Sequence, residues 1–97
     1  MKTEEQIKIE VTTAVVNDNR TKINDQIVQV EKEMEDLYKT KIDQDVQDTL
    51  EIAETGCTTK SPKVKEQDNK KFQQQLTDVR LQKEALEKKL KALDDFH

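Results

Sequence analysis

Apolar residues recur along this chain in alternating steps of four and three residues, in two runs separated by one interruption. The first run leads from Ile23 to Leu37, and the second leads from Phe72 to Leu93. This spacing keeps the apolar side chains on one stripe of a helix, as in helices that pair along a narrow seam. We therefore expect an all-α fold of two long helices, assembled as a coiled coil or helical bundle. The predicted contact residues are Ile23, Ile27, Val30, Met34, Leu37, Phe72, Leu76, Val79, Leu86, Leu90 and Leu93.

The interruption between the two runs holds the chain's only glycine, only cysteine and only proline, between Gly56 and Pro62. Glycine suits the end of a helix because it enters the left-handed region at little cost. Ser61 before Pro62 has the pattern of a helix start, with serine as the N-cap and proline at the first helical position. The sequence thus predicts a long N-terminal helix over 3–54, a loop over 55–61 and a C-terminal coiled-coil helix over 62–95.

The N-terminal residues carry mixed signals. Thr3 and Gln6 have the spacing of a capping box, which predicts a helix start. Ile7, Ile9 and Val11 alternate with polar residues, which is a strand pattern, and a turn could follow at 17–20. Because a lone short strand would have no partner, we favour helix here, with a possible irregularity at 12–20.

Beyond Leu37 the apolar stripe of the first helix shifts by about one residue. It continues at Tyr38, Ile42, Val46, Leu50 or Thr49, and Ala53. The shift moves the spacing from 3.5 toward about 3.6 residues per turn, so we expect the supercoil to relax locally. In the second helix, one stripe position is a lysine, Lys83, which must lie beside an acidic residue or extend to solvent.

The two helices differ in length. At about 1.5 Å per residue, the first helix would be roughly 75 Å long and the second about 48 Å. In an antiparallel hairpin the second would cover the first from Ala53 to about Val16–Ile23, leaving Ile7, Ile9 and Val11 uncovered. Helix pairing alone leaves open whether the helices are parallel or antiparallel, and whether the partner is the same chain or another helical protein.

Charge and composition exclude several classes of protein. Residues 1–54 carry 7 basic and 14 acidic side chains, whereas residues 67–97 carry 7 and 6, so the chain lacks the dense basic face of a nucleic-acid-binding protein. No apolar run approaches the length of a membrane span, and charges near Met1 argue against a signal peptide. A single cysteine fits a reducing, intracellular compartment, cytoplasmic or nuclear.

The sequence offers no constellation for catalysis, metal binding or cofactor binding, and no small-molecule substrate is implied. Cys57 would need a base, and the chain's one histidine is His97. A single glycine rules out a glycine-rich phosphate loop. Ser61 precedes proline among lysines, so we consider it a candidate phosphorylation site in addition to an N-cap.

We therefore expect a non-enzymatic scaffolding subunit that assembles by helix pairing. The alternative is a small helical chaperone or adaptor that binds a client along an exposed apolar stripe. A third interpretation is a piece of a longer filament-like protein, against which Met1 and the capping box at Thr3 indicate a natural start.

Overall fold

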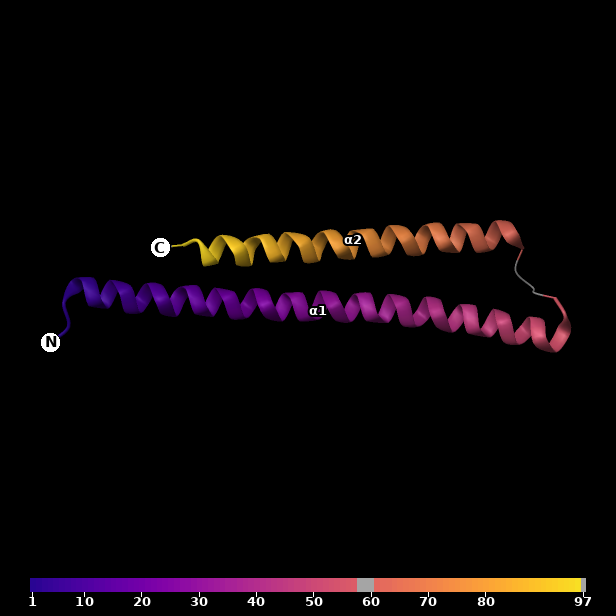
Figure 1. The fold of residues 1–97 in the computed structure, drawn as a ribbon, viewed down its shortest axis with the longest axis horizontal. Helices are drawn as coiled ribbons and strands as arrows, with labels where there is room; N and C mark the ends of the chain where they lie inside the picture. The colour runs from indigo at the N-terminus through magenta and orange to yellow at the C-terminus, as the bar shows by residue number, and fades with distance from the viewer. Residues whose placement is uncertain (58–60, 97) are drawn as a thin grey trace.

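The computed structural model describes residues 1–57 and 61–96, and their fold is a two-helix hairpin (Figure 1). Helix α1 spans Glu4–Thr55 and helix α2 spans Pro62–Asp94. The predicted all-α class with two helices is confirmed, and the described ranges contain no strand. Residues 12–20, where the sequence also allowed an irregularity, are regular helix within α1.

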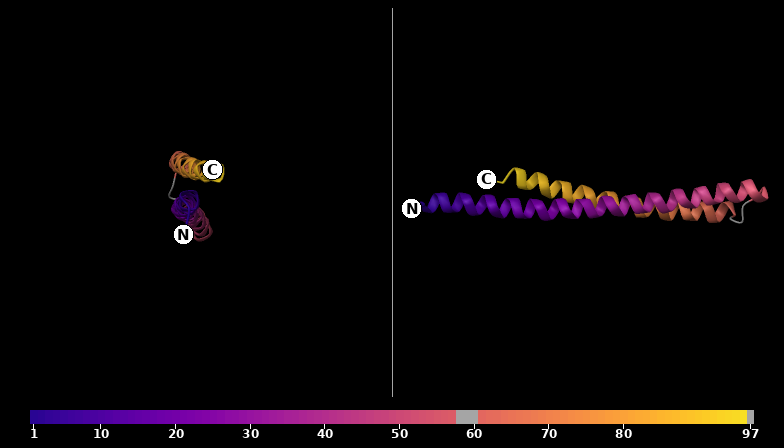
Figure 2. Two further views of the ribbon diagram at one scale, coloured as in Figure 1. Left: turned by 90° about the vertical axis from the view of Figure 1, so that its left-hand side faces the viewer. Right: turned by 90° about the horizontal axis from the view of Figure 1, so that it is seen from below.

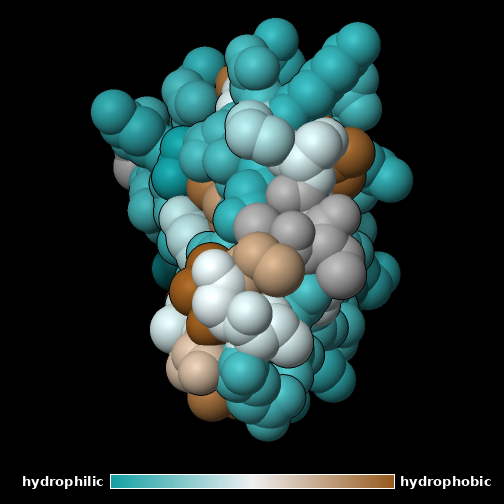
Figure 3. Space-filling model, turned by 90° about the vertical axis from the view of Figure 1, so that its right-hand side faces the viewer, coloured by the Kyte–Doolittle hydropathy of each residue, from teal (hydrophilic) through white to brown (hydrophobic). Residues whose placement is uncertain are grey.

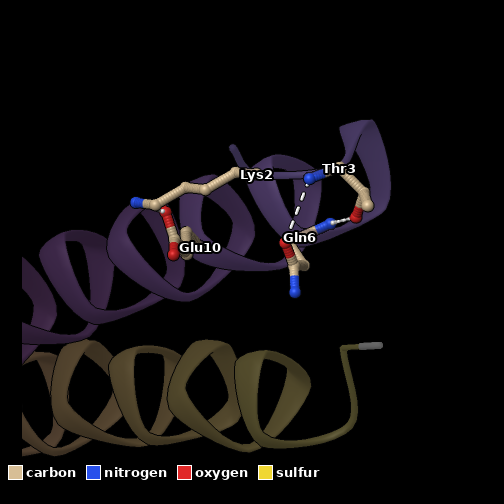
Figure 4. A network of polar contacts seen from close by, with 4 residues as sticks. All are labelled: Lys2, Thr3, Gln6 and Glu10. Atoms are coloured by element: carbon tan, nitrogen blue, oxygen red, sulfur yellow. Dashed lines mark hydrogen bonds and ion pairs between the residues drawn. The ribbon is translucent and has the colours of Figure 1, made fainter.

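Helix α1 begins with the capping box that the sequence predicts. The Thr3 hydroxyl accepts a hydrogen bond from the Gln6 backbone N–H at 3.2 Å, and the Gln6 side-chain oxygen accepts one from the Thr3 N–H at 3.0 Å (Figure 4). Lys2 pairs with Glu10 at 2.7 Å beside it. Two backbone donors at the helix start are thereby satisfied, and this favours helix over the strand pattern of the following residues.

The turn between the helices is built from the predicted residues. Gly56 caps α1 in the left-handed region, with φ 76°, and its N–H donates to the Ile52 carbonyl at 2.8 Å. The Ser61 hydroxyl accepts a hydrogen bond from the Val64 N–H at 3.3 Å, and Pro62 is the first residue of α2. Residues 58–60 of the predicted loop lie outside the described residues.

The two helices run antiparallel in one constant register. Arg20 pairs with Asp94 at 2.5 Å and Glu31 with Lys83 at 3.3 Å, so eleven residues separate the two contacts in each helix. Because α2 reaches only as far as Arg20, about four turns of α1 at its N-terminal end extend beyond α2. The N-terminal end of α1 projects past the C-terminal end of α2 in Figure 1.

The hairpin is long and thin. Its principal extents are 80 × 20 × 11 Å and its radius of gyration is 22.7 Å, whereas a globular domain of this length would have about 13 Å. The helices lie side by side along the pair and cross at a shallow angle (Figure 2). Three apolar side chains, Val30, Leu76 and Val79, are buried within the described ranges. The core is therefore a single seam between the two helices.

Candidate interaction surface

The eleven contact residues predicted from the sequence lie along the seam between α1 and α2. Val30, Leu76 and Val79 are buried, and the other eight are half-buried. The seam is therefore occupied mainly by the chain's own second helix. The half-buried members are Ile23, Ile27, Met34, Leu37, Phe72, Leu86, Leu90 and Leu93.

Polar side chains at the edges of the seam fix its register. The Lys83 ammonium lies 3.3 Å from the Glu31 carboxylate, which is one of the two environments expected for a lysine in the stripe. Tyr38 and Phe72 contact each other edge to face, with ring centroids 5.6 Å apart. Arg80 donates a hydrogen bond to the Tyr38 hydroxyl at 3.3 Å. A shift of the pairing by one residue would separate these partners.

From Ile42 onward the shifted stripe does not face α2, so the seam does not follow the apolar residues in this part of α1. The half-buried positions of this part of α1 are Lys41, Asp48 and Glu51, which continue the spacing of the seam. The physical reason lies in α2, whose opposing residues Lys65 and Asp68 are polar and offer nothing apolar to follow. The apolar residues of the shifted stripe that stay exposed are Ile42, Val46 and Leu50.

The N-terminal extension of α1 is a second uncovered surface. Ile7, Ile9 and Val11 are each about half exposed or more, as predicted for a helix longer than its partner, and Val15 is exposed as well. Viewed from the opposite end, where the turn lies, apolar patches also appear at the surface between hydrophilic side chains (Figure 3). At about 100° per residue, Ile7, Val11 and Val15 share one face of α1, whereas Ile9 lies on nearly the opposite side. Isolated apolar residues are normal on a surface, whereas several on one helix face indicate an interaction site.

Hollows lie along the side of the seam, and two of them are lined in part by seam residues. One, of about 670 Å³, is lined by residues that include Leu37, Phe72 and Lys71, and the other, of about 540 Å³, includes Val30 and Leu86. Both are open to solvent along the hairpin. Charged side chains line both hollows together with apolar and amide ones, so neither has the enclosed, mainly apolar lining that is typical of a small-molecule site.

The residues considered for chemistry are scattered. Cys57 is exposed beside the turn, and His97 lies outside the described residues. Among the described side chains, no group of three or more His, Cys, Asp or Glu could hold a metal ion. Ser61 is exposed and serves as the N-cap of α2.

No protein-family model, curated protein or solved structure matched this chain. Within the described ranges, neither helix has a segment long and apolar enough to cross a lipid bilayer.

Proposed function

We propose that this chain is a non-enzymatic scaffolding subunit that acts inside the cell and assembles with other helices, as a coiled coil or bundle. The observation that carries the proposal is the balance of burial. Three apolar side chains are buried within the described ranges, whereas fourteen large apolar side chains are exposed. Fully covering a Val, Leu or Ile side chain contributes about 1.5–3 kcal/mol, so a partner helix that covered several of them would add stability.

Light scattering of the pure chain, combined with circular dichroism, tests this proposal. We expect one of two results. Either the mass is a multiple of the 11.3 kDa monomer, or the pure chain is poorly helical and gains helicity only when it pairs with another helical protein. A stable, fully helical monomer that unfolds independently of concentration and binds no other helix would overturn the proposal.

Paired variants separate seam residues from surface residues. Replacing Leu86 and Leu90 with Asp puts two carboxylates into the half-buried seam, and we expect loss of both helicity and assembly. The matched control is Leu81→Asp, because Leu81 lies in the same helix and is 58% exposed. Equal losses in the two variants would contradict the role of the seam.

A second candidate is an adaptor or chaperone that holds a client on the N-terminal extension of α1. The exposed Ile7, Ile9 and Val11 favour it, because no part of α2 reaches them. A hydrophobic dye that brightens with the native protein, and loses this signal when the three residues become Ser, would support client binding. An unchanged dye signal in the variant would count against it.

A further inference from the structure

From Ile42 onward, the shifted stripe of α1 is an apolar face on the side of the helix away from α2. Ile42, Val46, Leu50 and Ala53 follow one another at steps of four, four and three residues. At about 100° per residue, these four positions fall within about 80° of the helix circumference. The seam positions Lys41 and Asp48 fall on nearly the opposite side by the same count.

The exposure of this face agrees with its position. Ile42 is 57% exposed, Val46 47% and Leu50 52%. A hairpin that needed only its own second helix would place apolar side chains at the seam and polar ones outside, whereas this part of α1 has the reverse arrangement. The face is therefore suited to a helix other than α2.

Between residues 42 and 54, the charged side chains that flank the stripe are acidic. This segment carries five carboxylates and no lysine or arginine, and two of the five, Asp48 and Glu51, lie at the seam rather than beside the stripe. Asp45 lies on one edge of the stripe, and Asp43 and Glu54 lie on the other edge by helical periodicity. Asp45 forms an ion pair at 3.3 Å with Lys41, which precedes residues 42–54 in the same helix. Charges that flank an apolar stripe select the partner helix and its orientation.

We infer that this face, Ile42–Val46–Leu50–Ala53 with its acidic edges, docks a basic amphipathic helix of another protein. The partner helix would present apolar residues at matching steps, flanked by lysine or arginine. The inference rests on the proposed function, because it specifies the partner of a scaffolding subunit.

A second copy of this chain fits the face poorly. Two such faces would bring the flanking carboxylates of Asp43, Asp45 and Glu54 against the same three, and like charges across a helix pair are unfavourable. The chain's own basic segment, 63–71, carries four lysines, but Val64 is its one apolar residue. An anionic lipid surface is also a poor match, because helices that lie on membranes carry lysine and arginine on their polar face.

A designed peptide tests the inference directly. The probe is a fluorescein-labelled peptide of about 18 residues, with Leu at steps of four, four and three and Lys at the flanking positions. Its control has Glu in place of every flanking Lys. In fluorescence anisotropy with the full chain, we expect the Lys peptide to bind at least about tenfold more tightly than the Glu peptide, with an advantage that shrinks at high salt.

Two variants of the chain locate the binding site. Changing Ile42, Val46 and Leu50 to Ser should weaken binding of the Lys peptide by about tenfold or more while circular dichroism remains that of the hairpin. The matched control changes Val28 and Leu81 to Ser, because both are 58% exposed but lie outside the stripe, and it should bind like the wild type.

Several outcomes would overturn the inference. They are failure of the Lys peptide to bind, equal binding of the Glu peptide, and equal losses in the stripe and control variants. Self-association of the wild type that disappears in the stripe variant would show that a second copy occupies the face. A chain that assembles but ignores the Lys peptide defeats this inference alone, whereas a stable monomer that ignores it defeats the proposed function as well.

Discussion

Replacing Leu76 with Ala tests whether the seam between the two helices holds the fold together. Leu76 is the most deeply buried side chain described, with 2% of its surface exposed. The change removes three carbon atoms at about 0.8 kcal/mol each and leaves a partial cavity. Because a two-helix seam can close around a small cavity, we expect a loss near the low end of the range for buried leucines, about 2–3 kcal/mol.

The measurement is thermal and urea denaturation followed by circular dichroism, at one fixed protein concentration because assembly would shift the midpoint. For a chain of this size, a loss of about 2–3 kcal/mol lowers the Tm by about 10–20 °C. Leu81→Ala is the control, since Leu81 lies in the same helix at 58% exposure and should change stability by at most about 0.5 kcal/mol. Equal destabilisation by the two substitutions would refute the assignment of the seam.

Three further predictions concern single positions. Lys83→Leu should raise the free energy of unfolding by about 1 kcal/mol, because an apolar side chain replaces a half-buried lysine whose ion pair with Glu31 is partly exposed and contributes little. Urea denaturation measures this, and a lower midpoint than that of the wild type would contradict it. Gly56→Ala should lower the free energy of unfolding by about 1 kcal/mol in urea denaturation. A Cβ at this position would meet open space, so the cost comes from the backbone, whose φ is 76°. An unchanged stability would argue against the left-handed cap. Ser61→Ala should cost about 1 kcal/mol while Ser61→Asp keeps the cap, and a Ser61→Glu variant with unchanged helicity and partner affinity would count against regulation by phosphorylation.

Much of the hairpin could be predicted because its local signals agree with one another. Steps of three and four in Ile23–Leu37 and Phe72–Leu93 identified both sides of the seam. Gly56 and Ser61 marked the two ends of the turn through backbone requirements that few other residues meet. The difference in helix length then required an uncovered N-terminal extension of α1.

The direction in which the shifted stripe faces could not be predicted from its own spacing. Ile42, Val46 and Leu50 have the pattern of a seam, and periodicity within one helix does not say which partner a stripe meets. The deciding information lies in the opposing segment of α2, where Lys65 and Asp68 offer no apolar surface. Pairing in register with the buried contacts at Leu76 and Val79 therefore turned the stripe outward.

In the hairpin, α2 folds back on α1 of the same chain. Pulsed electron paramagnetic resonance measures this pairing, with spin labels on the cysteines of Thr21→Cys and Asp95→Cys in a Cys57→Ser background. Packed helices lie about 8–10 Å apart, so we predict a label separation of about 20 Å that persists when labelled chain is diluted with unlabelled chain. Absence of a short separation, or its loss on dilution, would contradict the account.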